Sequence, residues 1–204
     1  KTERLAIPKK GRVYEQVFQT LIDAGLRLKK QERLDFCVCD ALGIEVYFLP
    51  AKDIPNAVAS GAIQYGITGI DLIENTDAKV DIHLPLGIGK ARVVLATPEE
   101  KPYKGPASLE GKIIGTSYPH LAKKFIRSHG IKNVRFVQFE GSVEIQVRLG
   151  VVDAIVEITE TGTTLKANRL EIREEFLCSE MVLVASKGYR GKALDKLKRR
   201  LQWV

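Results

Sequence analysis

The sequence predicts an α/β protein with two lobes, each built on a mainly parallel sheet. Short apolar runs typical of buried strands alternate with amphipathic segments of helical period. The alternation occurs on both sides of a polar stretch rich in proline and glycine at 99–111. The 204 residues, 45% of them hydrophobic, suit two small lobes with buried cores. Repeated strand–helix–strand units place helices on both sheet faces, and we assign lobe I to 1–93 plus 178–204 and lobe II to 94–177.

In the first half of the chain, runs of β-branched and aromatic residues define the strands. Two of these runs flank Leu42-Gly43 and are predicted to pair as a hairpin. A short helix is expected with Asp53 as its N-cap and Pro55 in its first turn. The stretch at 99–111 is expected to be a surface loop near a lobe boundary. Strands are expected at 4–8, 35–40, 44–50, 65–68 and 91–98, and helices at 13–25, 53–60 and from 69 onward.

The second half repeats the pattern. The closing segment at 191–204 has Leu194, Leu197 and Leu201 at helical spacing, which predicts an amphipathic helix with a solvated basic face. Strands are expected at 112–117, 134–139, 153–158, 171–177 and 181–185, and helices at 118–130, 142–150 and from 161 onward. Ligands of open α/β sheets bind outside the carboxyl ends of the strands, so the active site is expected in a cleft between the lobes.

Composition narrows the classes of partner. A net charge of +7 favours polyanions, either nucleic acid or small phosphorylated molecules. No basic stretch interleaved with aromatic residues is present, so nucleic acid is not expected. No apolar run approaches the ~18–20 residues that span a bilayer, so no membrane contact is expected. Cys37 and Cys39 share one strand face and Cys178 is remote, which predicts reduced thiols rather than a zinc site, and a cytoplasmic protein.

The segment DAIVEITETGTTL, at 153–165, combines a buried strand with an unusual polar turn. Glu157 lies near the carboxyl end of the strand and Asp153 near its start. Four residues of extended chain separate them by ~13 Å, so they cannot share one small ligand. Glu157 is therefore the candidate ligand residue, and Asp153 is expected to have a structural role.

The turn after Glu157 has the chemistry of a phosphate site. Gly162 allows the backbone to approach a ligand closely, and a helix N-terminus with threonine hydroxyls supplies donors to an anion. The neighbouring carboxylate could accept hydrogen bonds from a vicinal diol, so the predicted ligand is a ribose 5-phosphate. The alternative is an ordinary capped helix. The residues of this turn are Thr159, Glu160, Thr161, Gly162, Thr163 and Thr164.

Four other strand–turn–helix junctions carry candidate residues, each with an alternative. The cations of PKKGR, at 8–12, are suited to binding a polyphosphate. The alternative is that they form a basic surface loop without a ligand. Asp71 and Glu144 are candidate ligand residues. The alternative is that each carboxylate only stabilises the N-terminus of its helix through the helix dipole. Tyr118 could stack on a base, or pack in the core.

Together these stretches resemble the catalytic region of the ATP phosphoribosyltransferase family. The resemblance covers nearly the whole chain in order: LAIPKKGRV, AKDIPNAVASGAIQYGITGIDLI, LPLGIGKARVVLATP, GTSYPHLAKKFI and EGSVEIQVRLGVVDAIVEITETGTTLKANRL. It implies a fold like that of type II periplasmic binding proteins. It also implies transfer of the 5-phosphoribosyl group from phosphoribosyl pyrophosphate to N1 of ATP, with release of pyrophosphate, at the first step of histidine biosynthesis. The competing hypothesis is a non-catalytic two-lobe domain that binds a small molecule.

The resemblance also implies site residues. Lys10, Arg33 and Lys52 are expected to assist the departing pyrophosphate, and no residue is needed as a nucleophile. Mg²⁺ is expected, held mainly by substrate oxygens rather than by a protein metal site. The residues expected to bind phosphoribosyl pyrophosphate are Glu144, Glu157, Thr159, Glu160, Thr161, Gly162, Thr163 and Thr164. Those expected to bind ATP are Lys10, Gly11, Arg12, Gly69, Asp71 and Tyr118.

Some positions depart from the family pattern. Pro50 and Ala51 stand where an Arg is usual, and Glu157 where Asp is usual. A homodimer is expected, and no C-terminal regulatory domain. The chain is then a short form that needs a synthetase-like regulatory subunit, a truncated long form, or a designed core.

Overall fold

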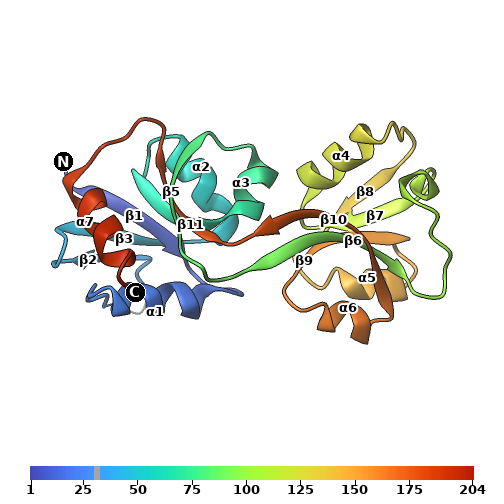
Figure 1. Ribbon diagram of the computed structural model, residues 1–204, viewed down its shortest axis with the longest axis horizontal. Coiled ribbons are helices and arrows are strands. Elements are labelled where there is room, and N and C mark those ends of the chain that lie inside the picture. Colours follow the sequence, from blue (N-terminus) through green and yellow to red (C-terminus); the bar gives the residue numbers. More distant parts are fainter. Residues whose placement is uncertain (30–32) are drawn as a thin grey trace. The chain divides into compact units, whose positions relative to one another are not determined.

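The computed structural model describes residues 1–29 and 33–204 (Figure 1). The chain divides into unit 1, Lys1–Lys90 with Glu180–Val204, and unit 2, Ala91–Ser179. Each unit has one sheet with helices on both faces. The divisions predicted from the sequence fall after residues 93 and 177.

The sheet of unit 1 has six strands in the order β2-β3-β1-β4-β11-β5. β1 pairs in parallel with β3 and β4, whereas β11 is antiparallel to both of its neighbours. The strands are β1 (Glu3–Pro8), β2 (Phe36–Cys39), β3 (Ile44–Leu49), β4 (Tyr65–Gly69), β5 (Val80–Pro85) and β11 (Met181–Ser186). The helices are α1 (Tyr14–Asp23), the 3-10 turn η1 (Ala51–Asp53), α2 (Ile54–Ala59), α3 (Ile70–Thr76) and α7 (Lys192–Leu201).

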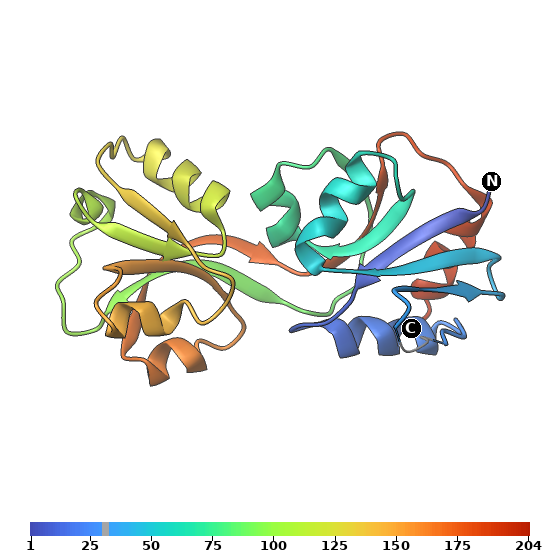
Figure 2. The same ribbon diagram turned by 180° about the vertical axis from the view of Figure 1, so that it is seen from behind.

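The alternating side chains of these strands build two apolar layers. On one face, Leu5 and Ile7 pack with Val17 of α1 and Leu197 of α7. On the other face, Ala6 packs with residues of α2 and α3. Figure 2 shows α2 and α3 together on one side of this sheet and α1 on the other. The one-residue alternation of β1 therefore serves both layers.

The sheet of unit 2 has five strands in the order β10-β6-β9-β7-β8. β7 is parallel to β8 and β9, and β6 is antiparallel to β9 and β10. The layer under α5 and α6 includes Val143, Ile155 and Leu165. The strands are β6 (Ala91–Pro98), β7 (Ile113–Thr116), β8 (Arg135–Gln138), β9 (Ala154–Thr159) and β10 (Leu170–Ser179). The helices are the 3-10 turn η2 (Pro106–Leu109), α4 (Pro119–Ser128), α5 (Glu144–Arg148) and α6 (Thr163–Ala167).

Three details correct the sequence prediction. The sheets are mixed rather than mainly parallel, because β2, β6, β10 and β11 add antiparallel pairs to the parallel strands. Asp53 makes no side-chain cap bond to α2, because η1 runs directly into that helix and leaves Asp53 in a helical conformation. β5 is a strand that the sequence analysis does not predict.

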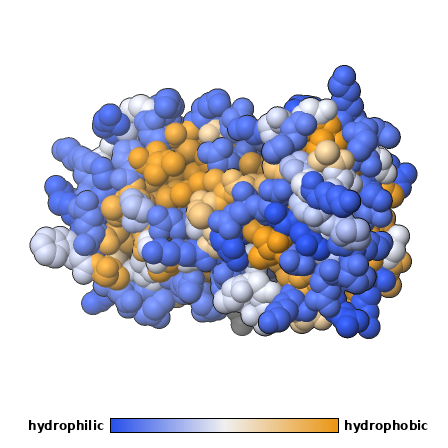
Figure 3. All heavy atoms as spheres, turned by 45° about the vertical axis from the view of Figure 1, so that its right-hand side comes forward, coloured by the Kyte–Doolittle hydropathy of each residue, from blue (hydrophilic) through white to orange (hydrophobic). Residues whose placement is uncertain are grey.

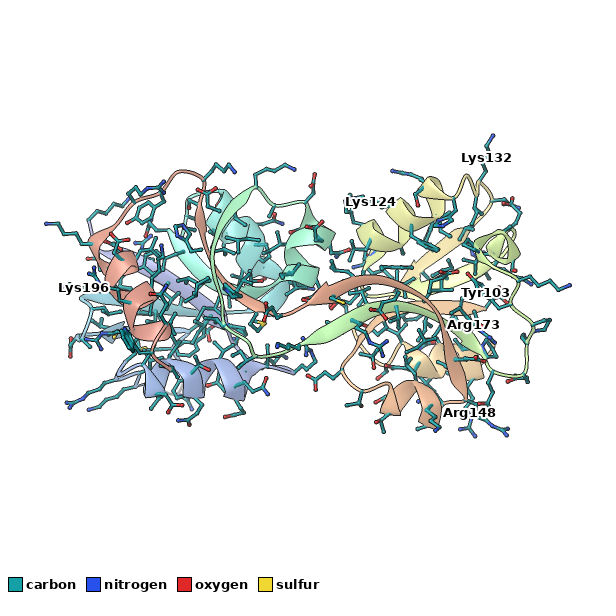
Figure 4. All side chains as sticks on the ribbon, viewed as in Figure 1. Tyr103, Lys124, Lys132, Arg148, Arg173 and Lys196 are labelled. Carbon is teal, nitrogen blue, oxygen red and sulfur yellow. The ribbon has the colours of Figure 1, made fainter. Side chains whose placement is uncertain are left out.

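The loop at 99–111 lies inside unit 2 and not at a boundary. Arg173 of β10 holds it: the guanidinium donates to the carbonyl oxygens of Pro98 at 3.3 Å and Lys101 at 3.0 Å. The Tyr103 hydroxyl donates to Glu174 at 2.9 Å, and Figure 4 shows Tyr103 and Arg173 close together at this end of the unit. Burial and this hydrogen bond raise the pKa of the Tyr103 phenol. The loop is thus a bonded part of the unit.

The described residues contain no helix long and apolar enough to cross a membrane. Cys37 and Cys39 are buried on one face of β2, Cys178 is exposed, and all three are free thiols, as the sequence predicts. Hydrophilic residues dominate the face shown in Figure 3, with apolar areas between them.

Candidate active site

The carboxyl ends of three parallel strands meet at one edge of the sheet of unit 2. Because β7 pairs in parallel with both β8 and β9, the turns after these strands lie along the same edge. These turns hold Ser117 and Tyr118, the stretch at 139–143, and the stretch at 160–162. Glu144 begins α5 directly after the second turn, and Ser142 before it has a φ of 51°, which is uncommon for a residue other than glycine.

Glu157 is a buried carboxylate at this edge, 9% exposed. Its Oε1 accepts the backbone N–H of Ile158 at 2.9 Å, and its Oε2 accepts the hydroxyl of Ser117 at 2.8 Å. The carboxylate is therefore held by donors from two neighbouring strands. Asp153, at the other end of β9, accepts the N–H of Ile113 at 2.9 Å, so the structural role predicted for it is confirmed.

The turn after β9 is shaped by its own threonine hydroxyls. Thr159 Oγ1 accepts the N–H of Gly162 at 2.9 Å. Thr161 and Thr163 share a hydrogen bond of 2.8 Å between their hydroxyls. Gly162 has a φ of 79°, and its nearest neighbour would lie 3.9 Å from an added Cβ, so glycine is needed there for backbone conformation and not for space.

Donors remain at this turn after the internal bonds are counted. Within residues 1–29 and 33–204, the N–H groups of Thr164 and Leu165 and the hydroxyl of Thr164 have no recorded acceptor. Thr164 is exposed. Glu160 is also exposed. An anion at this position can be bound by backbone and hydroxyl donors together.

Tyr118 is the predicted residue whose placement departs most from its expected role. Its side chain is only 6% exposed, and its N–H donates to Thr116 Oγ1 at 2.8 Å. The burial favours the packing alternative over stacking on a base. Glu144 is half-buried in the first turn of α5.

The second group of predicted residues lies at one edge of the sheet of unit 1. β1, β3, β4 and β5 run in the same direction, so their carboxyl ends share an edge. Arg33 precedes β2, whose first residue pairs beside the end of β3. It is exposed, next to residues 30–32, which lie outside the described part. The turns at this edge hold Lys10, Gly11, Arg12, Lys52, Gly69 and Asp71.

This edge is built mainly from exposed cations. Lys10, Arg12 and Lys52 are all exposed, whereas Asp71 is buried in the first turn of α3 at 3%. The guanidinium of Arg12 donates to the carbonyl oxygen of Gly89 at 3.3 Å. Gly89 has a φ of 65°, and an added Cβ would lie 2.8 Å from Val13 and 2.9 Å from Met181. Only glycine therefore fits the position that anchors Arg12.

Two contacts of this site were not predicted from the sequence. One is the contact of Ser117 with Glu157. The signal for it in the sequence is a hydroxyl residue directly after a predicted strand and beside Tyr118. Asp35 pairs with Lys9 at 3.0 Å across the edge of unit 1. No local pattern links those two residues, because the pairing depends on the order of strands in the sheet.

The model of one protein family, ATP phosphoribosyltransferase, matches residues 50–203. The chain belongs to this family. An ATP phosphoribosyltransferase of Rhodopirellula baltica is 43% identical over 202 residues, which cover 98% of this chain and 67% of that protein. One from Methanocella arvoryzae is 39% identical and is covered over 72% of its length. The resemblance to the ATP phosphoribosyltransferase family that was drawn from the sequence is thus confirmed.

Solved structures agree with this assignment. A chain of the ATP phosphoribosyl transferase (HisG:HisZ) complex from Thermotoga maritima superposes with a TM-score of 0.85 at 28% identity, and the match covers 100% of both chains. An ancestral arginine-binding protein matches with a TM-score of 0.62 at 19% identity over 99% of this chain and 91% of its own. The second match shows the fold alone, and it confirms the predicted likeness to periplasmic binding proteins.

Membership of the ATP phosphoribosyltransferase family assigns the activity. The chain is a transferase of histidine biosynthesis that joins ATP and phosphoribosyl pyrophosphate. These relatives support the enzymatic reading and not the non-catalytic binding domain.

Proposed function

We propose that the two edges divide the substrates of this reaction, with the phosphoribosyl group at the edge of unit 2 and the polyphosphate groups at the edge of unit 1. The observation that carries the proposal is the turn at 159–164. It offers N–H and hydroxyl donors that have no acceptor among the described residues, beside a buried carboxylate. Donors suit the 5-phosphate, and the carboxylate suits the ribose hydroxyls.

The roles at unit 2 follow from the kind of group that each residue presents. The N–H groups of Thr164 and Leu165 and the hydroxyl of Thr164 bind the phosphate oxygens, while Thr159, Thr161 and Thr163 hold the shape of the turn. Glu157 accepts hydrogen bonds from ribose hydroxyls, and Glu144 contacts the ribose from α5. Glu160, which is exposed, contributes at the rim of the site.

The roles at unit 1 follow from charge. In the proposed reaction, N1 of ATP attacks C1 of the ribose while pyrophosphate departs, through a transition state with positive charge on the ribose. Lys10, Arg33 and Lys52 neutralise the developing charge on pyrophosphate, and Gly11, Arg12, Gly69 and Asp71 bind ATP. Catalysis then consists of alignment and charge stabilisation, so no protein nucleophile is required.

Mg²⁺ is part of the proposal as an ion held mainly by substrate oxygens. No group of three or more His, Cys, Asp or Glu side chains gathers anywhere in the described residues. Mg²⁺ keeps several waters and commonly binds one or two carboxylates together with substrate phosphates. Glu157 and Glu144 are the carboxylates at the edge of unit 2 that could bind such an ion. When bound, the ion would neutralise charge on the pyrophosphate.

Two protein partners also belong to the proposal: a second copy of the chain and a synthetase-like regulatory subunit. The Thermotoga maritima structure is named as a HisG:HisZ complex. β2 is an edge strand of its sheet, with Phe36 40% and Val38 55% exposed on one side. An open apolar edge favours pairing with another chain. Val38→Lys is expected to lower the mass of the particle measured by light scattering, and an unchanged mass excludes β2 from the interface.

The test of the proposed function combines turnover with ligand binding. ATP, phosphoribosyl pyrophosphate and Mg²⁺ are mixed with the chain, and the absorbance of N1-ribosylated adenine is followed. Calorimetry with ribose 5-phosphate then isolates the edge of unit 2. We expect Thr164→Ala to weaken ribose 5-phosphate binding. Unchanged binding of both ribose 5-phosphate and phosphoribosyl pyrophosphate would remove the turn from the site.

A further inference from the structure

We infer that Ser117 is a positioning residue, which orients the carboxylate of Glu157 for recognition of the ribose. The inference deepens the proposed function and rests on it. Ser117 is half-buried at the carboxyl end of β7, and its hydroxyl donates to Glu157 Oε2 at 2.8 Å. Forty positions separate the two residues in sequence, so the contact is made by strand pairing and not by a local turn.

The backbone around Ser117 is held by its neighbour Thr116, which is fully buried. Thr116 is paired with Val156 in the register of β7 and β9, and its hydroxyl donates to the Val156 carbonyl oxygen at 2.7 Å. The same hydroxyl oxygen accepts the N–H of Tyr118 at 2.8 Å. One step beyond that pair on each strand, Ser117 therefore lies beside Glu157. Two successive hydroxyls thus tie the end of β7 to β9.

The chemical consequence is a carboxylate with a defined plane. The Ile158 N–H holds one oxygen of Glu157 and the Ser117 hydroxyl holds the other. An ionised carboxylate has about four acceptor positions, so it can bind a vicinal diol while its donors hold it. Glu has one more rotatable bond than Asp, and a donor on each oxygen limits that added freedom. Ser117 then acts on the ribose through Glu157 and contacts no reacting atom.

Titrating three ligands by calorimetry distinguishes a positioning role of Ser117 from a general effect on folding. The ligands are ribose 5-phosphate, 2-deoxyribose 5-phosphate and inorganic phosphate. Ser117→Ala is expected to weaken ribose 5-phosphate binding by about 5- to 10-fold, the scale of one hydrogen bond. The 2-deoxy sugar lacks one hydroxyl for Glu157, so its binding should fall by a smaller factor. Phosphate binding should not change. Ser128→Ala, which removes a hydroxyl bonded to the Phe125 carbonyl oxygen on α4, is the matched control.

A second pair of variants keeps the side-chain volume constant. Ser117→Thr retains the hydroxyl and Ser117→Val does not, so Thr should restore ribose 5-phosphate binding and Val should not. Equal loss for all three ligands, or equal behaviour of the Thr and Val variants, would overturn the inference. If Thr164→Ala weakens phosphate binding while Ser117→Ala leaves the preference for ribose over deoxyribose unchanged, the positioning role alone fails. If Thr164→Ala has no effect either, the proposed function fails first.

Discussion

The two candidate edges are built from different kinds of side chain. At unit 2, Glu157 accepts hydrogen bonds of 2.8–2.9 Å from Ser117 and from the Ile158 N–H. In the turn that follows, Thr159 accepts the N–H of Gly162 at 2.9 Å, and Thr161 and Thr163 share a bond of 2.8 Å. At unit 1, Lys10 and Arg12 follow β1 and Lys52 lies on η1, and all three side chains are exposed. One edge therefore has its groups arranged before a ligand arrives, and the other concentrates positive charge.

This difference matches two kinds of recognition. A hydrogen-bonded site distinguishes ligands by direction and can reject a sugar that lacks one hydroxyl. A set of exposed cations attracts any polyphosphate and is weakened by salt. In the proposed assignment, selection of the ribose is thus separated from attraction of the phosphates.

The largest loss of stability is expected at Gly89 of unit 1, where the backbone conformation and close packing both require glycine. In Gly89→Ala, the new Cβ would meet Val13 and Met181 below 3.0 Å in a left-handed conformation. We expect a loss of about 3 kcal/mol in the free energy of unfolding, from strain and overpacking together. Gly87→Ala is the control, because Gly87 has a φ of 69° but no atom within 4 Å of an added Cβ. It should lose about 1 kcal/mol.

Urea titration followed by circular dichroism measures both variants. Equal losses for Gly89→Ala and Gly87→Ala would show that the contacts with Val13 and Met181 carry no cost.

The second effect concerns Glu157→Gln. The amide keeps one oxygen acceptor but loses the charge, and hydrogen bonds to a charged group are worth about 1.5–3 kcal/mol. We expect kcat/KM for phosphoribosyl pyrophosphate to fall by roughly 10- to 150-fold, while the urea midpoint changes little. Near-normal turnover, or a variant that fails to fold, would contradict a ligand role for this carboxylate.

The third effect is the loss of one hydroxyl from the turn. Thr164→Ala removes a donor that has no recorded partner within the described residues. Binding of ribose 5-phosphate should weaken by ~1–2 kcal/mol. Thr20→Ala, which removes a hydroxyl bonded to the Gln16 carbonyl oxygen on α1, should leave the affinity unchanged. Calorimetry of the two variants side by side decides whether the turn binds phosphate.

Much of this contrast could be predicted from the sequence, because it depends on local pattern. The segment at 153–165 shows a strand, its carboxyl end and a glycine turn in order, so the sequence predicts different roles for Glu157 and Asp153. The structural role of Asp153 is confirmed, and the ligand role of Glu157 stays a prediction. The strands around Leu42-Gly43 were predicted for the same reason. β5 was missed although Val80, Ile82 and Leu84 alternate with polar residues, since a five-residue alternation in a loop-like stretch is a weak signal.

What the sequence could not provide was pairing between distant strands. Ser117 and Glu157 meet because β7 and β9 are parallel neighbours, and the antiparallel pairs of β6 and β11 depend on where the chain enters each sheet. The burial of Tyr118, directly before α4, likewise depends on tertiary packing. Such facts follow from topology, and no residue spacing encodes them.

The smallest effect is expected from a single cation of unit 1. Lys52 is exposed on η1, and exposed charge pairs contribute about 0.2–1 kcal/mol. Lys52→Gln should therefore weaken pyrophosphate binding by only about 2- to 5-fold at low ionic strength. Because salt screens exposed charges, the difference from the parent chain should shrink as the ionic strength rises toward 1 M, where the screening length is about 3 Å.

The control for this variant is Lys132→Gln, which makes the same change in net charge on an exposed loop of unit 2 (Figure 4). It should leave pyrophosphate affinity unchanged at every salt concentration, because Lys132 follows α4 and precedes β8, at the edge opposite the candidate site. Ribose 5-phosphate binding should be insensitive to Lys52→Gln, since its donors lie at the turn of unit 2. A Lys52→Gln effect that persists at high salt would mean that Lys52 acts through a directed hydrogen bond, and the two edges would then recognise their ligands in the same way.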